Sequence, residues 1–272
     1  MTLQSAQHVA VAAWWLPTRV SPGHTLDCRL GPLRLQIHRA PGEWQVATFA
    51  DAESVEAGHA ELVKLEGAID AEDFQRYMFS REDEGLRLVP VLLDRPVVIR
   101  PRQPVFLPSG EETTLYMSSP VMVRVEVGEP PVTLCEIPTV RLSDSWFGSS
   151  TREGELCYAG RTHARQHADE VPRRSYRAIT AARIRNEAST PLLLERVSLP
   201  IPALSVYGTA EGQLWTESVA LVRGSNSELA ALHIDDAPPD HAGAAERLCP
   251  PRHPQSRGTL VRAFSALFGD RQ

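Results

Sequence analysis

The chain has 272 residues and a formal net charge of -6, and this length suits either two domains or one large β domain that folds without disulfide bonds. The negative charge gives no reason to expect a nucleic acid as partner. Its four cysteines lie far apart and form no C-x-x-C pair, which is typical of reduced thiols in the cytosol and argues against a disulfide framework.

The N-terminal segment does not have the features of a signal peptide. The apolar run at residues 9–16 is short, has no basic residue before it and ends at Pro17. No run in the chain approaches the ~20 apolar residues that span a bilayer. We therefore expect a cytoplasmic protein that is membrane-associated only through a partner, with at most peripheral contact of its own.

Alternating apolar and polar residues predict β-strands in the first half of the chain. Leu33, Leu35 and Ile37 alternate with three polar side chains, a period of two that places one face of a strand in a core. Further strands are predicted at residues 44–49, 87–93, 96–100 and 113–117, and valines at every second position predict one at 121–127. Short strands with Gly and Pro between them indicate an all-β fold made of two β-sandwich-like units.

Residues 51–84 differ from the strands around them, because they hold eleven acidic residues against three basic ones. We interpret this segment as a short, solvated acidic insertion in the N-terminal unit. Within it, residues 60–69 place Leu62, Leu65 and Ile69 on one side of a short predicted helix.

The proline-rich segment at residues 128–138 is the best candidate for a boundary between the units. The predicted N-terminal β domain covers residues 1–135, and the C-terminal β-sandwich domain covers residues 136–235. In the second unit, residues 176–184 and 192–199 are predicted to form a hairpin around a polar turn. Another pair of strands is predicted at 204–207 and 213–222.

A glycine-rich loop at residues 141–161 mixes aromatic side chains with both signs of charge, as ligand grooves do. Its candidate residues for ligand or partner binding are Asp144, Trp146, Phe147, Glu153, Glu155, Tyr158 and Arg161. Trp215 and Glu217, on a later strand, are assigned to the same region by residue type alone. Two alternatives stay open: Glu153 and Glu155 act as acid and base, or the loop is structural.

Residues 161–185 hold seven arginines against two acidic residues. An arginine-lined face of a sheet could meet phosphate or an acidic partner, or could complement the acidic 51–84 segment of the same molecule.

The C-terminal segment is predicted to be a linker followed by a helix. Residues 236–258 are rich in Pro, Gly and Ala and read as a disordered linker. Residues 259–269 then read as an amphipathic helix that ends at a glycine, with an apolar stripe of Leu260, Val261, Phe264, Leu267 and Phe268. A helix this short is marginal alone, so it should dock on its own domain, on a partner protein or second copy, or on a membrane surface.

None of the common catalytic or nucleotide-binding motifs occurs in the sequence. We therefore predict no catalytic residues, no metal and no cofactor. The predicted function is that of a non-catalytic binding or accessory protein with a protein partner. Two alternatives are a small-ligand or carbohydrate-binding or hydrolytic protein that uses the 141–161 loop, and a structural subunit of a homo-oligomer.

Several short motifs are shared with a known family. They are P-V-V-I-R-P at residues 96–101, L-Y-M-S-S-P at 115–120, W-F-G at 146–148, G-E-L-C-Y at 154–158, and the later elements I-R-N at 184–186, P-L at 191–192 and L-P at 199–200. In their order they resemble an uncharacterised prokaryotic family, domain of unknown function 432, over roughly residues 75–235, and the C-terminal tail is a further candidate for this resemblance. The resemblance implies a cytoplasmic accessory role near a small mechanosensitive channel of the bacterial inner membrane. It carries over no catalytic residue.

Overall fold

The computed structural model describes residues 9–50, 60–69, 71–81, 83–150, 152–224, 229–254 and 259–264. Within these ranges the chain is built from strands and three single-turn 3-10 helices, η1 (Ala168–Glu170), η2 (Ile201–Ala203) and η3 (Asp240–Ala242). The prediction of an all-β fold is confirmed. The strands form two large sheets and two small ones.

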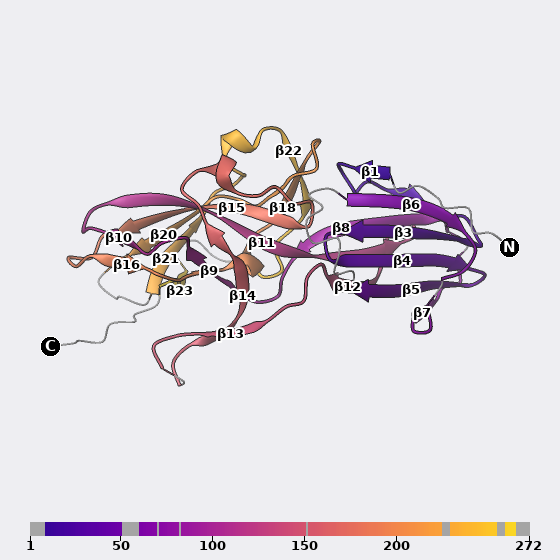
Figure 1. Ribbon diagram of the computed structural model, residues 1–272, viewed down its shortest axis with the longest axis horizontal. Helices are drawn as coiled ribbons and strands as arrows, with labels where there is room; N and C mark the ends of the chain where they lie inside the picture. Colours follow the sequence, from indigo (N-terminus) through magenta and orange to yellow (C-terminus); the bar gives the residue numbers. More distant parts are fainter. Residues whose placement is uncertain are drawn as a thin grey trace.

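A six-stranded antiparallel sheet occupies one end of the molecule (Figure 1). Leu35 and Ile37 of its predicted strand are fully buried, as the alternation required. The order across the sheet is β1 (Val9–Val11), β6 (Ala60–Glu66), β3 (His24–Leu30), β4 (Leu33–Ala40), β5 (Glu43–Ala50) and β7 (Gln75–Met78).

The predicted acidic insertion is wrong where the structure describes it, because β6 and β7 belong to this sheet. β6 pairs with β3 along its whole length, from His24↔Glu66 to Leu30↔Ala60. The predicted helix at 60–69 is therefore also wrong. A neighbouring strand satisfies the backbone groups of an extended segment, whereas a helix of about ten residues is marginal. Residues 51–59, 70 and 82 lie outside the described residues.

The second large sheet has eleven strands, and the 16-residue strand β11 (Glu112–Val127) joins its two parts. Its first part, up to Pro120, pairs with β15, and from Val121 onward it pairs with β8 on one side. Pro120, which has no N–H, stands where the partner changes. The other strands are β2 (Thr18–Arg19), β8 (Gly85–Leu92), β12 (Val132–Pro138), β15 (Arg177–Asn186), β18 (Val206–Thr209), β19 (Leu214–Trp215), β20 (Val219–Arg223), β21 (Leu229–Ile234), β22 (Ala245–Cys249) and β23 (Leu260–Arg262).

The two small sheets contain the remaining strands. One has the order β13 (Asp144–Phe147), β14 (Glu155–Ala164), β9 (Val97–Pro101) and β17 (Val197–Leu199), and the other pairs β10 (Val105–Leu107) with β16 (Leu192–Leu194). The predicted hairpin of residues 176–184 with 192–199 is therefore wrong. β15 pairs with β11, β19 and β20, while β16 and β17 pair with β10 and β9. Local alternation shows that a segment is extended but does not select its partner.

The C-terminal segment is bound to the body of the protein, which corrects two predictions. β22 pairs with β18, so residues 245–249 of the predicted linker form an ordered strand. β23 pairs with β21 where a helix was predicted. The open edge of β21 satisfies the backbone N–H and C=O groups of β23, whereas a helix this short is marginal. Phe264 is 2% exposed and bridges Val197, whereas Leu260 is 63% exposed. Leu267 and Phe268 lie outside the described residues.

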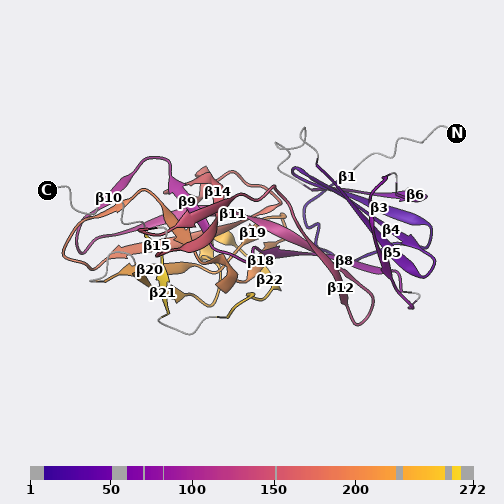
Figure 2. The same cartoon turned by 90° about the horizontal axis from the view of Figure 1, so that it is seen from below.

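A single cluster of buried apolar side chains extends from the six-stranded sheet to the C-terminal strands. β8 and β11 run between the two ends of the elongated molecule in both views (Figures 1 and 2). The Trp14 Nε1–H also donates to the Ser175 carbonyl at 2.9 Å. The position 135/136 falls inside β12, and the division of the chain into two units there stays a prediction.

The turn at Gly212 is a close contact between distant parts of the chain. Gly212 has φ +83°, and a Cβ there would lie 2.2 Å from the Ala12 carbonyl oxygen. We expect Gly212→Ala to lower the free energy of unfolding by about 3 kcal/mol or more, because backbone strain and a clash with backbone add together. Gly110→Ala is the matched control: its φ is +82° with nothing nearby, so it should cost only about 1–2 kcal/mol. Equal losses of unfolding free energy for the two variants in urea denaturation would show that the backbone at Ala12 moves away without cost.

Candidate functional site

The predicted site residues fall into two separate parts of the fold. Most belong to the β13–β14 hairpin, where Asp144 faces Tyr158 and Trp146 faces Leu156. Trp215 lies instead in β19, in a buried cluster with Val171, Ile179 and Tyr207. Glu217 is also buried there and accepts hydrogen bonds from the Ser205 N–H at 2.7 Å and the Tyr207 hydroxyl at 3.3 Å. Residue type alone had placed Trp215 and Glu217 beside the loop. The structure puts Trp215 in a strand of another sheet and Glu217 in the segment that follows this strand.

The β13–β14 hairpin projects from the body of the protein (Figure 1) and has two different faces. Phe147 is fully buried against Val98 and Cys157 and anchors one face. On the other face, the cross-strand neighbours Trp146 and Leu156 are 44% and 43% exposed. Side chains of successive residues in a strand point to opposite faces, so the same pairing that buries Phe147 exposes Trp146.

The exposed indole of Trp146 is held in place. Its Nε1–H donates to the Ser150 carbonyl at 2.8 Å. A Cβ on Gly154 would lie 2.7 Å from the Trp146 Cε2 atom, so the ring packs directly on this glycine. The Ser150 hydroxyl accepts the backbone N–H of Glu153 at 3.1 Å, which orders the turn. A large apolar side chain that is exposed but immobilised loses little entropy when it binds a partner.

Polar contacts attach the base of the hairpin to the body. The Tyr158 hydroxyl donates to Asp94 at 3.0 Å, and the Arg95 guanidinium lies 5.2 Å from the centre of the Tyr158 ring. Arg95 also pairs with Asp144 at 3.2 Å. Burial, together with the Asp94 carboxylate, raises the pKa of Tyr158. These residues therefore serve to orient the hairpin.

The two carboxylates proposed as acid and base lie in different environments. Glu153 is exposed at the turn, whereas Glu155 is partly buried and accepts a hydrogen bond from the Ser198 hydroxyl at 3.5 Å. Burial raises the pKa of Glu155. Burial and the nearby Glu155 raise the pKa of Cys157 to about 11, so its thiol is protonated and a poor nucleophile at neutral pH.

Arg161, at the inner end of the hairpin, has an unusual backbone. Its φ is +51°, and among the described residues it alone of the non-glycine residues has a positive φ. The pairing of β14 with β9 shifts register between Ala159 and His163, and Arg161 occupies this irregularity. The Arg161 guanidinium donates to the Ser143 hydroxyl. An unusual backbone conformation in the middle of a strand often marks a functional site, where the irregularity orients a side chain.

Arginines of residues 161–185 gather beyond Arg161, around the buried Arg177. Hydrogen bonds join Arg177 to Ser118 of β11, 59 positions away in the chain. The excess of arginine was visible in the sequence. The neutral hydrogen-bond partners of Arg177 could not be predicted from the sequence, because they come from distant strands.

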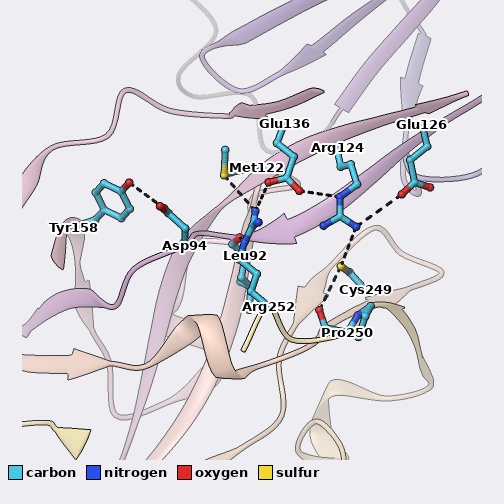
Figure 3. A network of polar contacts seen from close by, with 10 residues as sticks. All are labelled: Leu92, Asp94, Met122, Arg124, Glu126, Glu136, Tyr158, Cys249, Pro250 and Arg252. Carbon is cyan, nitrogen blue, oxygen red and sulfur yellow. Dashed lines mark hydrogen bonds and ion pairs between the residues drawn. The ribbon is translucent and has the colours of Figure 1, made fainter. Parts of the chain in front are cut away.

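A network of ionic contacts holds the C-terminal segment against β11 and β12 (Figure 3). Glu136 accepts from the Arg124 Nε–H at 2.8 Å and from the Arg252 Nη2–H at 2.5 Å. Arg252 also donates to the Leu92 carbonyl at 2.6 Å. The network thus fixes residues that were predicted to belong to a disordered linker.

Two kinds of feature are absent from the described part of the chain. None of its helices is long and apolar enough to cross a membrane. No group of three or more His, Cys, Asp or Glu side chains in the same ranges is arranged to hold a metal ion.

Comparison with known proteins places the chain in a family. The model of a family described as protein of unknown function, DUF432, matches residues 14–269. No curated protein and no solved structure matches the chain. The resemblance carried by the short motifs is confirmed, and it extends well beyond residues 75–235. Because the match covers nearly the whole sequence, the chain belongs to the DUF432 family.

Proposed function

We propose that the protein is a non-catalytic accessory protein that binds a protein partner through the Trp146–Leu156 face of the β13–β14 hairpin. The observation that carries this proposal is the exposed but immobilised Trp146 on a projecting hairpin. Tryptophan is enriched among the residues that dominate binding energy at protein interfaces. Exposed polar residues at the turn, such as Arg152 and Glu153, would form the rim of such an interface.

The partner we propose is a small mechanosensitive channel of the bacterial inner membrane, met from the cytoplasmic side. This choice rests on the family resemblance. The contact predicted first from the sequence, the C-terminal apolar stripe, has less support, because Phe264 is buried in the protein itself. A hydrolytic or carbohydrate-binding role has less support too, since Trp215 and Glu217 lie away from the hairpin, in and just after β19.

The test measures binding of the purified chain to the purified channel in detergent. We expect Trp146→Ala to weaken binding by roughly thirtyfold, the effect of losing about 2 kcal/mol at a central interface residue. Phe106→Ala is the matched control, because Phe106 is an exposed aromatic residue on β10, outside the hairpin. It should change the affinity less than about twofold.

Two outcomes would overturn the channel proposal. One is absence of binding by the unmodified chain, and the other is equal weakening by Trp146→Ala and Phe106→Ala. Light scattering of the chain alone tests the remaining alternative. A dimer that Trp146→Ala converts to a monomer would assign the hairpin to a homo-oligomer.

A further inference from the structure

Arg177 is a buried cation without a carboxylate partner in the described part of the protein. It is 6% exposed and lies at the start of β15. Its Nε–H donates to the Ser118 hydroxyl at 2.8 Å, and its Nη2 donates to the carbonyls of Ser118 at 2.6 Å and Gly160 at 3.1 Å. All these acceptors are neutral. They orient the guanidinium but do not cancel its charge.

The charge of Arg177 persists at neutral pH. Burial lowers its pKa to about 10, which still leaves the side chain protonated. Its Nη1 makes no hydrogen bond to any of the described residues, so one side of the guanidinium fork is available. An arginine that is largely buried, held by neutral acceptors and left with one Nη without an acceptor among the described residues is pre-organised to bind an anion.

A small hollow of about 170 Å³ lies against Arg177. Its lining contains one histidine and no carboxylate, and the four arginines in it are Arg161, Arg165, Arg174 and Arg177. None of these four forms an ion pair with a described residue. Four like charges around one hollow repel one another, and an anion between them would remove this repulsion.

Two of the other arginines are also held in place. Arg174 donates to the Tyr176 hydroxyl at 3.2 Å. The backbone of Arg165 exchanges two hydrogen bonds with Tyr116, of 2.7 and 3.0 Å. The guanidinium of Arg174 and the backbone that carries Arg165 are therefore positioned before any ligand arrives, which lowers the entropy lost on binding.

We propose that this hollow binds a phosphate group, either as inorganic phosphate or as the end of a phosphate monoester. Pockets for drug-sized molecules measure about 300–1,000 Å³, so this one suits a single tetrahedral anion. A second hollow of about 290 Å³ shares Arg174 and Arg177 and has one carboxylate, Glu211, in its lining.

Titration calorimetry of the full chain with inorganic phosphate, at constant ionic strength, tests the proposal. We expect saturable binding with one phosphate per chain. Arg174→Gln and Arg165→Gln should each weaken it about tenfold or more, as the loss of a charge-assisted hydrogen bond does. Arg183→Gln removes the same charge from an exposed position of β15 outside the hollow, and it should leave the affinity unchanged. Arg177 itself is not substituted, because its hydrogen bonds join three segments of the fold. The less buried Arg174 and Arg165 are substituted in its place.

The source of the phosphate group is settled by two further ligands. Binding of glycerol phosphate in solution supports the proposal and assigns the site to a soluble monoester. Sedimentation with vesicles of phosphatidic acid in phosphatidylcholine, lost in Arg174→Gln, supports it and assigns a lipid headgroup. Absence of saturable binding of all three ligands overturns it, and so does equal weakening by Arg183→Gln.

This inference is independent of the proposed partner. Trp146→Ala should leave phosphate binding unchanged, because Trp146 does not line the hollow. Loss of channel binding in Trp146→Ala with normal phosphate binding would keep the two sites distinct. Failure of either experiment leaves the other proposal standing.

Discussion

Phe264→Ala should lower the free energy of unfolding by about 3–5 kcal/mol, the usual cost of emptying a buried phenylalanine site. Phe264 is 2% exposed and belongs to the main core cluster, where its backbone bridges Val197. Removing the ring leaves a cavity and weakens the attachment of β23 to β21. Urea denaturation followed by tryptophan fluorescence measures the change.

Leu260→Ala is the matched control for this prediction. Leu260 lies in the same segment but is mostly exposed, so its truncation should change the free energy of unfolding by less than about 0.5 kcal/mol. In the helix predicted from the sequence, Leu260 and Phe264 would share one face and matter alike. Similar costs for the two variants would therefore contradict the strand and its packing.

Glu136→Gln should lower the free energy of unfolding by about 2–3 kcal/mol, because it leaves the partly buried Arg252 without its carboxylate and Arg124 with only the longer pair to Glu126, at 3.8 Å. Arg124 and Arg252 both donate to Glu136, and the side chains of all three are at most 24% exposed. Glu187→Gln is the control: its pair with Arg185 is about half exposed, so the cost should stay below about 0.5 kcal/mol. Equal costs in urea denaturation at pH 7 would show that the network contributes nothing beyond a surface pair.

The cost of Glu136→Gln should also depend on pH. Burial alone would raise the pKa of Glu136, but the hydrogen bonds from Arg252 and Arg124 outweigh it, and the net effect is a lowered pKa. A carboxyl whose pKa is lowered in the folded state stabilises the protein above its unfolded pKa, and this contribution is lost as the pH falls through the folded pKa. The difference between the two proteins should therefore be constant near neutrality and shrink below about pH 4.5. A difference that grows in acid would contradict this origin.

The extended segments were predictable from the sequence, but their partners were not. Alternating valines located residues 121–127 within β11, because one buried face imposes a period of two. Nothing local indicated that β11 continues through Pro120 to β15, since that pairing joins segments about 60 positions apart. Among the described acidic residues of the 51–84 segment, Glu66, Glu72 and Asp73 are exposed to water, and an edge strand such as β7 shares such exposure with a loop.

The tail prediction failed for a related reason. Apolar residues at 260, 261 and 264 fit both a helix face and a short strand that is followed by a buried ring. The available edge of β21 decides between them, and that edge is a tertiary feature. The periodicity of apolar residues therefore cannot decide between a helix and a strand in this segment.

The candidate sites were predictable only in composition. The aromatic and charged character of residues 141–161 pointed to the hairpin, but the pattern did not tell the exposed Trp146 from the buried Phe147. Trp215 was grouped with them by type and lies in another cluster. The arginine excess in 161–185 indicated an anion surface, whereas the buried state of Arg177 depends on Ser118 and Gly160.

The shared strand β11 has a consequence for how this family can vary. A break in the chain at 135/136 would cut β12 and leave Val121–Val127 with one open edge, so neither end could be exchanged for a foreign module without loss of a neighbour. Insertions would instead be tolerated at exposed turns outside the proposed sites, such as residues 102–104 between β9 and β10. Diversity among relatives should accordingly concentrate in that turn, while the length of β11 stays constant.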